Sequence, residues 1–439
     1  MEFRREEILP GVFLTALRTD KFKTAVLSLS LLAQLDAETA SMNALIPSVL
    51  RRGTVRCPDM DSLAAYMDGL YGLRAEPVVR CIGEIQAPGF VASFPEDRFL
   101  PRGERLLERA AGLLGELLLS PNTRGGLFLP DYVERERARL AERIRAKRNN
   151  KDAYAVLRLI ELMCAYEPIA VGSLGSEQAA EDIHYVALSK HYKNLIASSP
   201  IEVFYCGASG WDDVLFAVSG ALEALPRGEI DWDLGTEIRM NSVEEQPRVF
   251  KEHMDVSQGK LAIGWRLGEC MEEPDMAKLR VFNAVYGSGS TSKLFMNVRE
   301  KLSLCYYASS IAYIHKGLLL VASGIDFDKF EAARDEIFAQ LEAVKKGEIS
   351  DEELGSAKRC VASDLRSLTD SQGELEGFYL SQTLDGLDYG PMELAELVEE
   401  VTKEDIISIA NSVECDMIYF LRGLDEEEAS EEESEDGQA

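Results

Sequence analysis

The sequence predicts an α+β protein built from two homologous halves. Three observations lead to this expectation: the same order of strands and helices occurs twice, a polar and poorly periodic segment separates the two occurrences, and 46% of the 439 residues are apolar. That apolar content is enough to form sizeable cores. We therefore expect an N-terminal half at residues 1–228, a linker at 229–249 and a C-terminal half at 250–424.

The first half is expected to run strand, helix, strand, helix, helix. Alternation of apolar and polar residues marks its strands, and amphipathic spacing marks its helices. The expected elements are a strand at Thr24–Leu31, a helix at Ser41–Arg52, a strand at Gly89–Phe94, and helices at Arg102–Leu119 and Asp131–Lys147.

The second half repeats this pattern, with a glycine-rich break between its first two helical segments. Its last helix also opens like that of the first half, since Leu129-Pro130-Asp131 and Ile349-Ser350-Asp351 both combine a helix-start residue with acids in the first turn. The expected elements are a strand at Lys260–Leu267, helices at Met276–Tyr286 and Lys293–Lys301, a strand at Gly317–Ser323, and helices at Asp328–Lys346 and Asp351–Ser367.

The charge balance excludes several classes of partner. The chain has 47 Lys and Arg residues against 76 Asp and Glu residues, a formal net charge of −29. Nucleic-acid binding draws its affinity from basic residues that displace counterions, and anionic membranes attract basic segments. No apolar run approaches the roughly 18 residues that a membrane span needs. We expect no nucleic-acid partner and no membrane partner.

The eight cysteines are widely dispersed and form no C-x-x-C pair. This pattern argues against a disulfide framework and against a zinc knuckle, and it favours a reducing cytoplasm. The acidic, low-complexity segment at residues 425–439 has no large apolar side chain to bury, so we expect it to be a disordered tail.

The sequence alone offers no intact catalytic motif. The loop Gly287–Leu294 contains Gly, Ser and Lys, but Ser292 precedes Lys293 and Leu294 follows it, which fails the spacing of a phosphate-binding loop. His184 and His191 are two helical turns apart, too far for one zinc ion. No G-x-S-x-G turn supports a serine hydrolase. We expect no metal site.

One segment resembles the pitrilysin/insulinase family of zinc metallopeptidases. The residues Gly287-Ser288-Gly289-Ser290-Thr291-Ser292-Lys293-Leu294-Phe295, followed by Val298-Arg299-Glu300-Lys301 and Tyr306, are similar to the family's C-terminal signature. The resemblance covers roughly residues 5–420. It implies two α+β halves with antiparallel-rich sheets and flanking helices, which close as a clamshell.

The family's zinc-binding motif is degenerate in this chain. In active members a helix carries H-x-x-E-H shortly before Gly-Thr: the two histidines hold zinc and the glutamate activates water. Counted back from Gly53-Thr54, the matching positions are Ala44, Pro47 and Ser48. None of these can act as a zinc ligand or a general base in that role. The resemblance therefore implies a member that is inactive as a peptidase on its own.

A later acidic helix in the family supplies a further glutamate ligand, and Glu134 and Glu136 fall near that position. One carboxylate alone does not hold catalytic zinc. Beside Arg135 and Arg137, these glutamates are expected to be acids on a solvated helix face.

The substrate-contacting residues of the family are retained. In relatives an Arg and a Tyr from the half without zinc reach the substrate, and these correspond to Arg299 and Tyr306. A guanidinium can hold peptide carbonyls, and a phenol can donate to a developing oxyanion. The alternative is that Arg299 lies on an ordinary charged helix surface and that Tyr306 and Tyr307 pack in a strand.

The erased metal motif beside a retained substrate motif predicts a pseudo-peptidase subunit. It would bind peptide or protein substrate, pair with a homologous zinc-bearing chain and complete that partner's chamber, so zinc is expected only in the partner. The bacterial branch associated with modification of elongation factor P is similar in carrying apolar residues and Pro where zinc ligands belong. Two alternatives stay open: an inert structural or assembly protein of this fold, and an active metallopeptidase with unrecognised ligands.

Overall fold

The structure is a computed structural model that describes residues 2–101 and 103–424. Its described residues form two compact units. The N-terminal unit consists of Met1–Ala146, Val171–Thr236 and Ser371–Asp388, and the C-terminal unit of Lys147–Ala170, Glu237–Asp370 and Tyr389–Ala439. The expected acidic tail at 425–439 lies outside the described residues.

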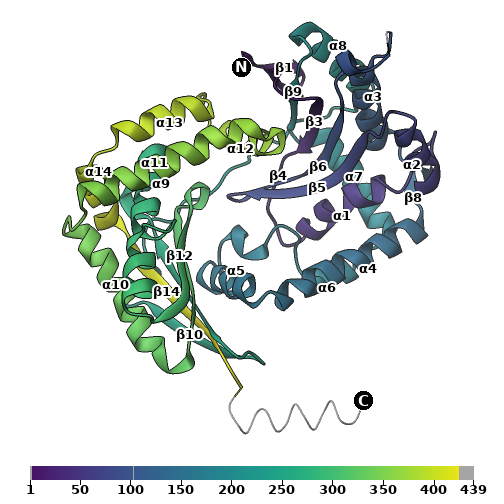
Figure 1. Cartoon of the computed structure of the whole chain (residues 1–439). Helices are drawn as coiled ribbons and strands as arrows, with labels where there is room; N and C mark the ends of the chain where they lie inside the picture. Colours follow the sequence, from purple (N-terminus) through teal and green to yellow (C-terminus); the bar gives the residue numbers. More distant parts are fainter. Residues whose placement is uncertain (1, 102, 425–439) are drawn as a thin grey trace, which may run out of the picture. The chain divides into compact units, whose positions relative to one another are not determined.

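The N-terminal unit contains a mixed sheet in the order β1-β2-β9-β3-β6-β4, with β5 paired to β6 (Figure 1). Thr24–Leu31 alternates as the sequence predicts, yet both faces of this strand are buried because helices cover the sheet. The strands β7 (Thr123–Arg124) and β8 (Leu127–Phe128) form a separate two-stranded hairpin. The strands are β1 (Glu2–Leu9), β2 (Val12–Arg18), β3 (Thr24–Leu31), β4 (Ala33–Gln34), β5 (Arg74–Ile82), β6 (Ile85–Pro95) and β9 (Ile201–Gly207).

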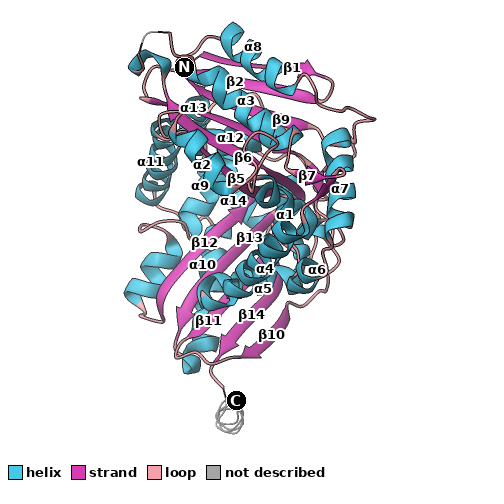
Figure 2. Cartoon of the chain, turned by 90° about the vertical axis from the view of Figure 1, so that its right-hand side faces the viewer, coloured by secondary structure: helices cyan, strands magenta, loops and turns pink. Residues whose placement is uncertain are grey.

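The C-terminal unit contains a sheet in the order β10-β14-β11-β13-β12, whose strands lie side by side in Figure 2. The strand β11 is central, and its register pairs Ala262 with Ala322 on one side and Tyr419 on the other. The strands are β10 (Arg248–His253), β11 (Gly259–Arg266), β12 (Cys305–Tyr313), β13 (Leu318–Ile325) and β14 (Glu414–Arg422).

The two sheets share one topology. In the first, β2 runs parallel to β9, and the order continues through antiparallel β3, β6 and β5. In the second, β10 runs parallel to β14, and the order continues through antiparallel β11, β13 and β12. Five strands of the first sheet therefore have counterparts in the second, and β1 and β4 are additional; the shared order confirms the expected α+β class and the duplicated unit.

The helices repeat in the same order. Between matching strands, α1 corresponds to α9, α3 to α10, α4 to α11 and α5 to α12. The helices are α1 (Ala40–Leu50), α2 (Met60–Asp68), α3 (Leu106–Leu119), α4 (Pro130–Ala146), α5 (Lys151–Met163), α6 (Glu177–Glu181), α7 (Tyr185–Ser198), α8 (Trp211–Leu222), α9 (Met276–Tyr286), α10 (Phe330–Lys345), α11 (Asp351–Ser367), α12 (Gln372–Leu384), α13 (Pro391–Glu400) and α14 (Lys403–Ser412).

The helix α5 belongs to the C-terminal unit although it lies in the N-terminal half of the sequence. Its apolar residues Leu159 and Met163 pack on the face of the second sheet that presents Ala262. On the other face of that sheet Trp265 packs against Phe338 of α10. Figure 1 shows α5 and α10 on opposite sides of the sheet.

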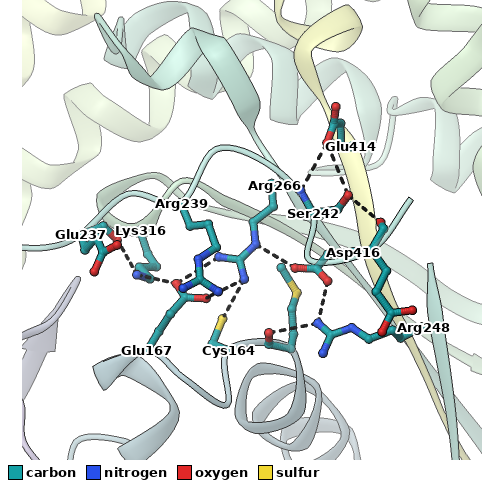
Figure 3. Close-up of polar contacts among 12 residues, drawn as sticks. Cys164, Glu167, Glu237, Arg239, Ser242, Arg248, Arg266, Lys316, Glu414 and Asp416 are labelled. Carbon is teal, nitrogen blue, oxygen red and sulfur yellow. Dashed lines mark hydrogen bonds and ion pairs between the residues drawn. The ribbon is translucent and has the colours of Figure 1, made fainter. Parts of the chain in front are cut away.

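A buried charge network fixes the segment that follows α5 to the second sheet (Figure 3). The guanidinium of Arg266, on β11, donates to both carboxylate oxygens of Glu167 at 2.6 and 3.1 Å and to Asp416 of β14 at 2.9 Å. Lys316 also pairs with Glu167, at 2.7 Å. Paired geometry of this kind compensates the cost of burying charges.

The helix α12 lies in the C-terminal half of the sequence but belongs to the N-terminal unit, where it packs on the first sheet. Leu375 is buried against Phe204 and Cys206. Glu376 accepts a hydrogen bond from Ser28 at 2.8 Å and pairs with Arg80 at 2.6 Å. Each unit is therefore completed by one helix from the other half of the chain.

The expected helices Met276–Tyr286 and Asp351–Ser367 and the strand Thr24–Leu31 have the predicted bounds. The helix expected at Arg102–Leu119 begins at Leu106, because Gly103 adopts a positive φ of 91°. The change of unit after Thr236 falls within the expected linker, 229–249. Because α5 and α12 each belong to the unit of the other half, the compact units are not contiguous halves of the chain. The expected halves at 1–228 and 250–424 therefore stay a prediction about the repeat in the sequence.

Candidate functional site

The positions predicted to be a degenerate zinc motif lie on α1, in the N-terminal unit. Ala44 is 1% exposed, Pro47 is also buried, and Ser48 is partly buried. Pro47 lies in the helix interior, where it removes a backbone donor at a cost of about 3 kcal/mol. Within residues 2–101 and 103–424, no group of three His, Cys, Asp or Glu residues is arranged to hold a metal ion. The helix that would carry zinc ligands instead contributes apolar side chains to the core.

Glu136 of α4 is buried and pairs with Arg52, which follows α1. The Nε of Arg52 donates to Glu136 Oε1 at 2.5 Å, and Arg139 donates to the same oxygen at 3.0 Å. The expectation of a solvated acid holds for Glu134, which is exposed beside Arg137, and is wrong for Glu136. Glu136 shares the buried face of α4 with Val133 and Leu140, so it is buried with that face. The guanidinium of Arg52 balances its charge.

In a polar network next to Ala44, the donor and the acceptor of each hydrogen bond can be assigned. The side chain of Asn43 donates to Gln86 Oε1 at 2.9 Å, and Gln86 Nε2 donates to the carbonyls of Ala40 and Ser173. Asn43 Oδ1 must therefore accept, which assigns the proton to Nε2 of His191 across 2.6 Å. Burial lowers the pKa of His191, so this ring is held as a neutral hydrogen-bond donor rather than as a cation.

Arg299 lies in the C-terminal unit on η5 (Leu294–Lys301), which is wound as a π-helix. The expected helix is present, but its hydrogen bonds span five residues, as from Leu302 N to Asn297 O at 3.1 Å. Lys293 fixes the start of η5 through Glu353 of α11 at 2.8 Å, and Asn297 bonds Gln340 of α10 at 2.9 Å. These contacts hold η5 rigidly against its neighbours.

The side chain of Arg299 is partly exposed. Its guanidinium carbon lies 4.7 Å from the ring centroid of Phe295, one turn earlier, and its Nε lies 3.5 Å from Glu300. Stacking on Phe295 orients the plane of the guanidinium and leaves donors available to a ligand.

Tyr306 lies on β12, after a tight bend at Ser303. Ser303 has a positive φ of 50°, uncommon for a residue with a side chain, and its N–H donates to Arg299 O at 3.0 Å. Tyr306 is 60% exposed, and its hydroxyl donates to Asp326 at 3.0 Å. The phenol therefore reaches solvent, which disagrees with the alternative that Tyr306 packs in the strand.

The bend at Ser303 connects η5, which carries Arg299, to β12 (Cys305–Tyr313), which carries Tyr306. Burial raises the pKa of Cys305, beside Tyr306, and the nearby charge of Arg299 acts in the opposite direction. The hydrogen bond to Asp326 raises the pKa of Tyr306, so the phenol keeps its proton at neutral pH. The pair thus presents a cation and a neutral O–H donor, which suits peptide carbonyls and an oxyanion.

Two partners in this region were not expected from the sequence. Asp326, which follows β13, holds the phenol of Tyr306, and Phe295 supports Arg299. The spacing of Phe295 and Arg299, four residues apart on a helix, is the signal that could have identified the second. Asp326 is distant in sequence and is brought close by the pairing of β12 with β13.

Comparisons with known proteins agree with this fold. The family description "Peptidase M16 inactive domain" matches residues 182–360. A Bacillus subtilis protein named "Probable inactive metalloprotease YmfF" is 34% identical over 417 residues, covering 94% of this chain and 96% of that protein. No helix in the described part of the chain is long and apolar enough to span a bilayer.

Solved structures show the same fold. A conserved protein from Enterococcus faecalis superposes with a TM-score of 0.86 at 24% identity, covering 96% of this chain and 99% of that one. A peptidase M16 inactive domain from Pseudomonas fluorescens has a TM-score of 0.78 at 17% identity, covering 97% and 99%. At these identities the likeness concerns the fold alone.

Proposed function

From the premise that this chain belongs to the M16 peptidase family, the pitrilysin/insulinase family, as a non-catalytic member, we propose that it is the substrate-binding subunit of a two-chain peptidase. A homologous chain with an intact H-x-x-E-H motif would hold zinc and cleave the peptide. This chain would supply Arg299 and Tyr306 to the substrate.

The single observation that carries the proposal is the contrast between the two site regions. The helix α1 has Ala44, Pro47 and Ser48 buried in a core, whereas Arg299 and Tyr306 stay accessible on elements fixed by several side-chain contacts. Arg299 therefore offers an exposed cation and Tyr306 an exposed O–H donor, the two kinds of group that a bound peptide would need.

The two residues are assigned different roles. Arg299 binds a peptide carbonyl in the ground state, because its charge and its stacked orientation are already present without substrate. Tyr306 donates to the oxygen that becomes negative during attack, and its hydroxyl leaves Asp326 to do so. The two substitutions should therefore affect different kinetic constants.

The test is co-expression with an H-x-x-E-H homologue, purification of the complex, and cleavage of a fluorogenic peptide. Arg299→Ala is expected to raise KM roughly tenfold, and Tyr306→Phe to lower kcat roughly tenfold with KM little changed. Arg334→Ala is the matched control: Arg334 also stacks on a phenylalanine four residues earlier and contacts the next residue's carboxylate.

The alternatives give other results. An inert structural protein would associate with the homologue, and its Arg299→Ala complex would cleave at the unchanged rate. An active peptidase would cleave without a partner and be inhibited by a chelator. A cytoplasmic location and membership of the branch linked to elongation factor P remain parts of the proposal; the first rests on the dispersed cysteines.

A further inference from the structure

Two cavities of about 10 Å³ each lie on opposite faces of the first sheet. One lies between the sheet and α12 and is lined by Ser28 and Ser30 of β3; the other lies between the sheet and the helices α3 and α8 and is lined by Leu27 and Leu29 of the same strand. We call the first the polar cavity and the second the apolar cavity. A space of this size is close to the smallest that accommodates one water molecule.

The polar cavity contains a buried hydroxyl group that has no partner. Ser30 is 1% exposed, and its Oγ forms no hydrogen bond within the residues that the structure describes. The hydroxyl of Ser28, two residues earlier, instead donates to Glu376 of α12 at 2.8 Å. Buried polar groups in folded proteins are nearly always hydrogen-bonded, either to the protein or to ordered water.

Glu202 of β9 brings a carboxylate oxygen without a donor to the same place. Glu202 lies directly opposite Ser30 in the antiparallel register of β3 and β9, so the two side chains leave one face of the sheet with their Cβ atoms roughly 5 Å apart. Arg5 donates to Glu202 Oε1 at 2.6 Å, and Oε2 accepts no hydrogen bond from the described part of the chain. Both residues line the polar cavity, which therefore borders an unpaired donor and an unpaired acceptor.

We infer that the polar cavity holds one ordered water molecule, hydrogen-bonded to the hydroxyl of Ser30 and to Oε2 of Glu202, and that the apolar cavity is dry. A buried water makes two to four hydrogen bonds, and the hydroxyls of Thr15 and Thr383 also line the polar cavity. The apolar cavity is lined by aliphatic residues and glycine, whose side chains offer a water no partner. This inference does not depend on a partner chain or on the proposed role of Arg299.

Water suits this place because it can donate and accept. Burial raises the pKa of Glu202 to about 7, so both of its protonation states occur near neutral pH. The charged groups around it are Arg5 of β1 and Glu376 of α12, which pairs with Arg80 of β5 at 2.6 Å. Beside the ionised carboxylate the water donates to Oε2 and accepts from Ser30; beside the neutral acid it accepts from the carboxyl group and donates to Ser30. The buried carboxyl group can therefore titrate without rearrangement of its neighbours.

The test is a crystal structure of the full chain at a resolution that shows ordered waters, from crystals grown below and above the Glu202 pKa of about 7. At both pH values we expect one peak in the polar cavity, roughly 2.6–3.0 Å from Ser30 Oγ and from Glu202 Oε2. The apolar cavity, which has the same volume, is the internal control and should contain no peak.

Ser30→Ala removes one partner of the water and should abolish the peak. Ser41→Ala is the matched control: Ser41 is another buried serine of the N-terminal unit, but it donates directly to the carbonyl of Leu174 at 3.1 Å, so the peak should stay. The inference is overturned by a polar cavity without a peak at either pH, by a water in the apolar cavity, or by contacts of about 2.0–2.6 Å, which indicate a metal ion. These results come from the unchanged chain and need no variant. A peak that is unchanged in Ser30→Ala would also overturn it.

Discussion

Arg52 and Glu136 form a buried ion pair that joins the end of α1 to α4, with Arg52 Nε 2.5 Å from Glu136 Oε1. The pair lies beside the positions where active relatives hold zinc. In this pair an acidic side chain on the buried face of α4 is balanced by a basic residue of the chain itself.

Removal of Arg52 should destabilise the protein strongly. Arg52→Met leaves the Glu136 carboxylate buried beside one partly exposed arginine, and we expect a loss of roughly 3 kcal/mol in the free energy of unfolding. The double variant Arg52→Met/Glu136→Leu should recover most of that loss. Denaturant titration measures both, with Glu134→Gln as the exposed control on the same helix, expected within about 0.5 kcal/mol of the unchanged chain. A double variant as unstable as the single one would contradict this account.

Glu167 should be similarly important for attachment of the α5 segment. Burial raises the pKa of Glu167, but hydrogen bonds from Arg266 and Lys316 outweigh it and lower the pKa to about 2. The stabilisation is therefore present above the unfolded-state pKa of 4.5 and is lost as pH falls towards 2. Glu167→Gln should cost roughly 3–5 kcal/mol at pH 7 and progressively less below pH 4.5.

Denaturant unfolding at a series of pH values measures this dependence. Glu161→Gln, an exposed acid on α5 paired with Arg158, serves as the control and should have little effect at any pH. A Glu167→Gln cost that stays constant down to pH 2 would show that the carboxylate charge contributes nothing.

Glu202 on β9 should give the opposite pH dependence. Burial raises the pKa of Glu202 to about 7, although Arg5 pairs with it at 2.6 Å. The folded state binds the proton of Glu202 more tightly than the unfolded state does. The stabilisation that results is therefore fully present below pH 4.5 and is lost as pH rises through 7.

The difference in stability between the unchanged chain and Glu202→Gln should therefore shift by about 2–3 kcal/mol between pH 4.5 and 7.5, with the variant gaining relative stability as pH rises. Glu6→Gln, an exposed acid on β1, should show no such shift. A flat difference for Glu202→Gln across this range would mean that the side chain titrates as an exposed glutamate does.

The repeated fold could be predicted because its signals are local. Alternation in Thr24–Leu31 and the amphipathic patterns of Met276–Tyr286 and Asp351–Ser367 are recorded in short stretches of sequence. The exchange of α5 and α12 could not be predicted in this way. An amphipathic helix indicates that one face is buried, but not which sheet buries it.

The site was predictable only in part. The M16 family and the α+β fold are confirmed. The family resemblance also predicted that Ala44, Pro47 and Ser48 occupy the zinc-motif positions and that Arg299 and Tyr306 occupy the substrate positions. The burial of Glu136 was missed because alternating charges on α4 resemble a solvated face. Its spacing from Val133 and Leu140 was the available signal. The assignment of Arg299 and Tyr306 to substrate stays a prediction.

The central claim is that hydrolysis is performed by a partner and assisted by this chain. The most direct measurement is the rate of peptide cleavage by a zinc-bearing homologue at fixed concentration, titrated with this chain. We predict that this chain alone gives no cleavage, and that the partner's rate rises to a plateau at a fixed stoichiometry. Chelator-sensitive cleavage by this chain alone, or a partner rate unchanged at saturation, would contradict the account.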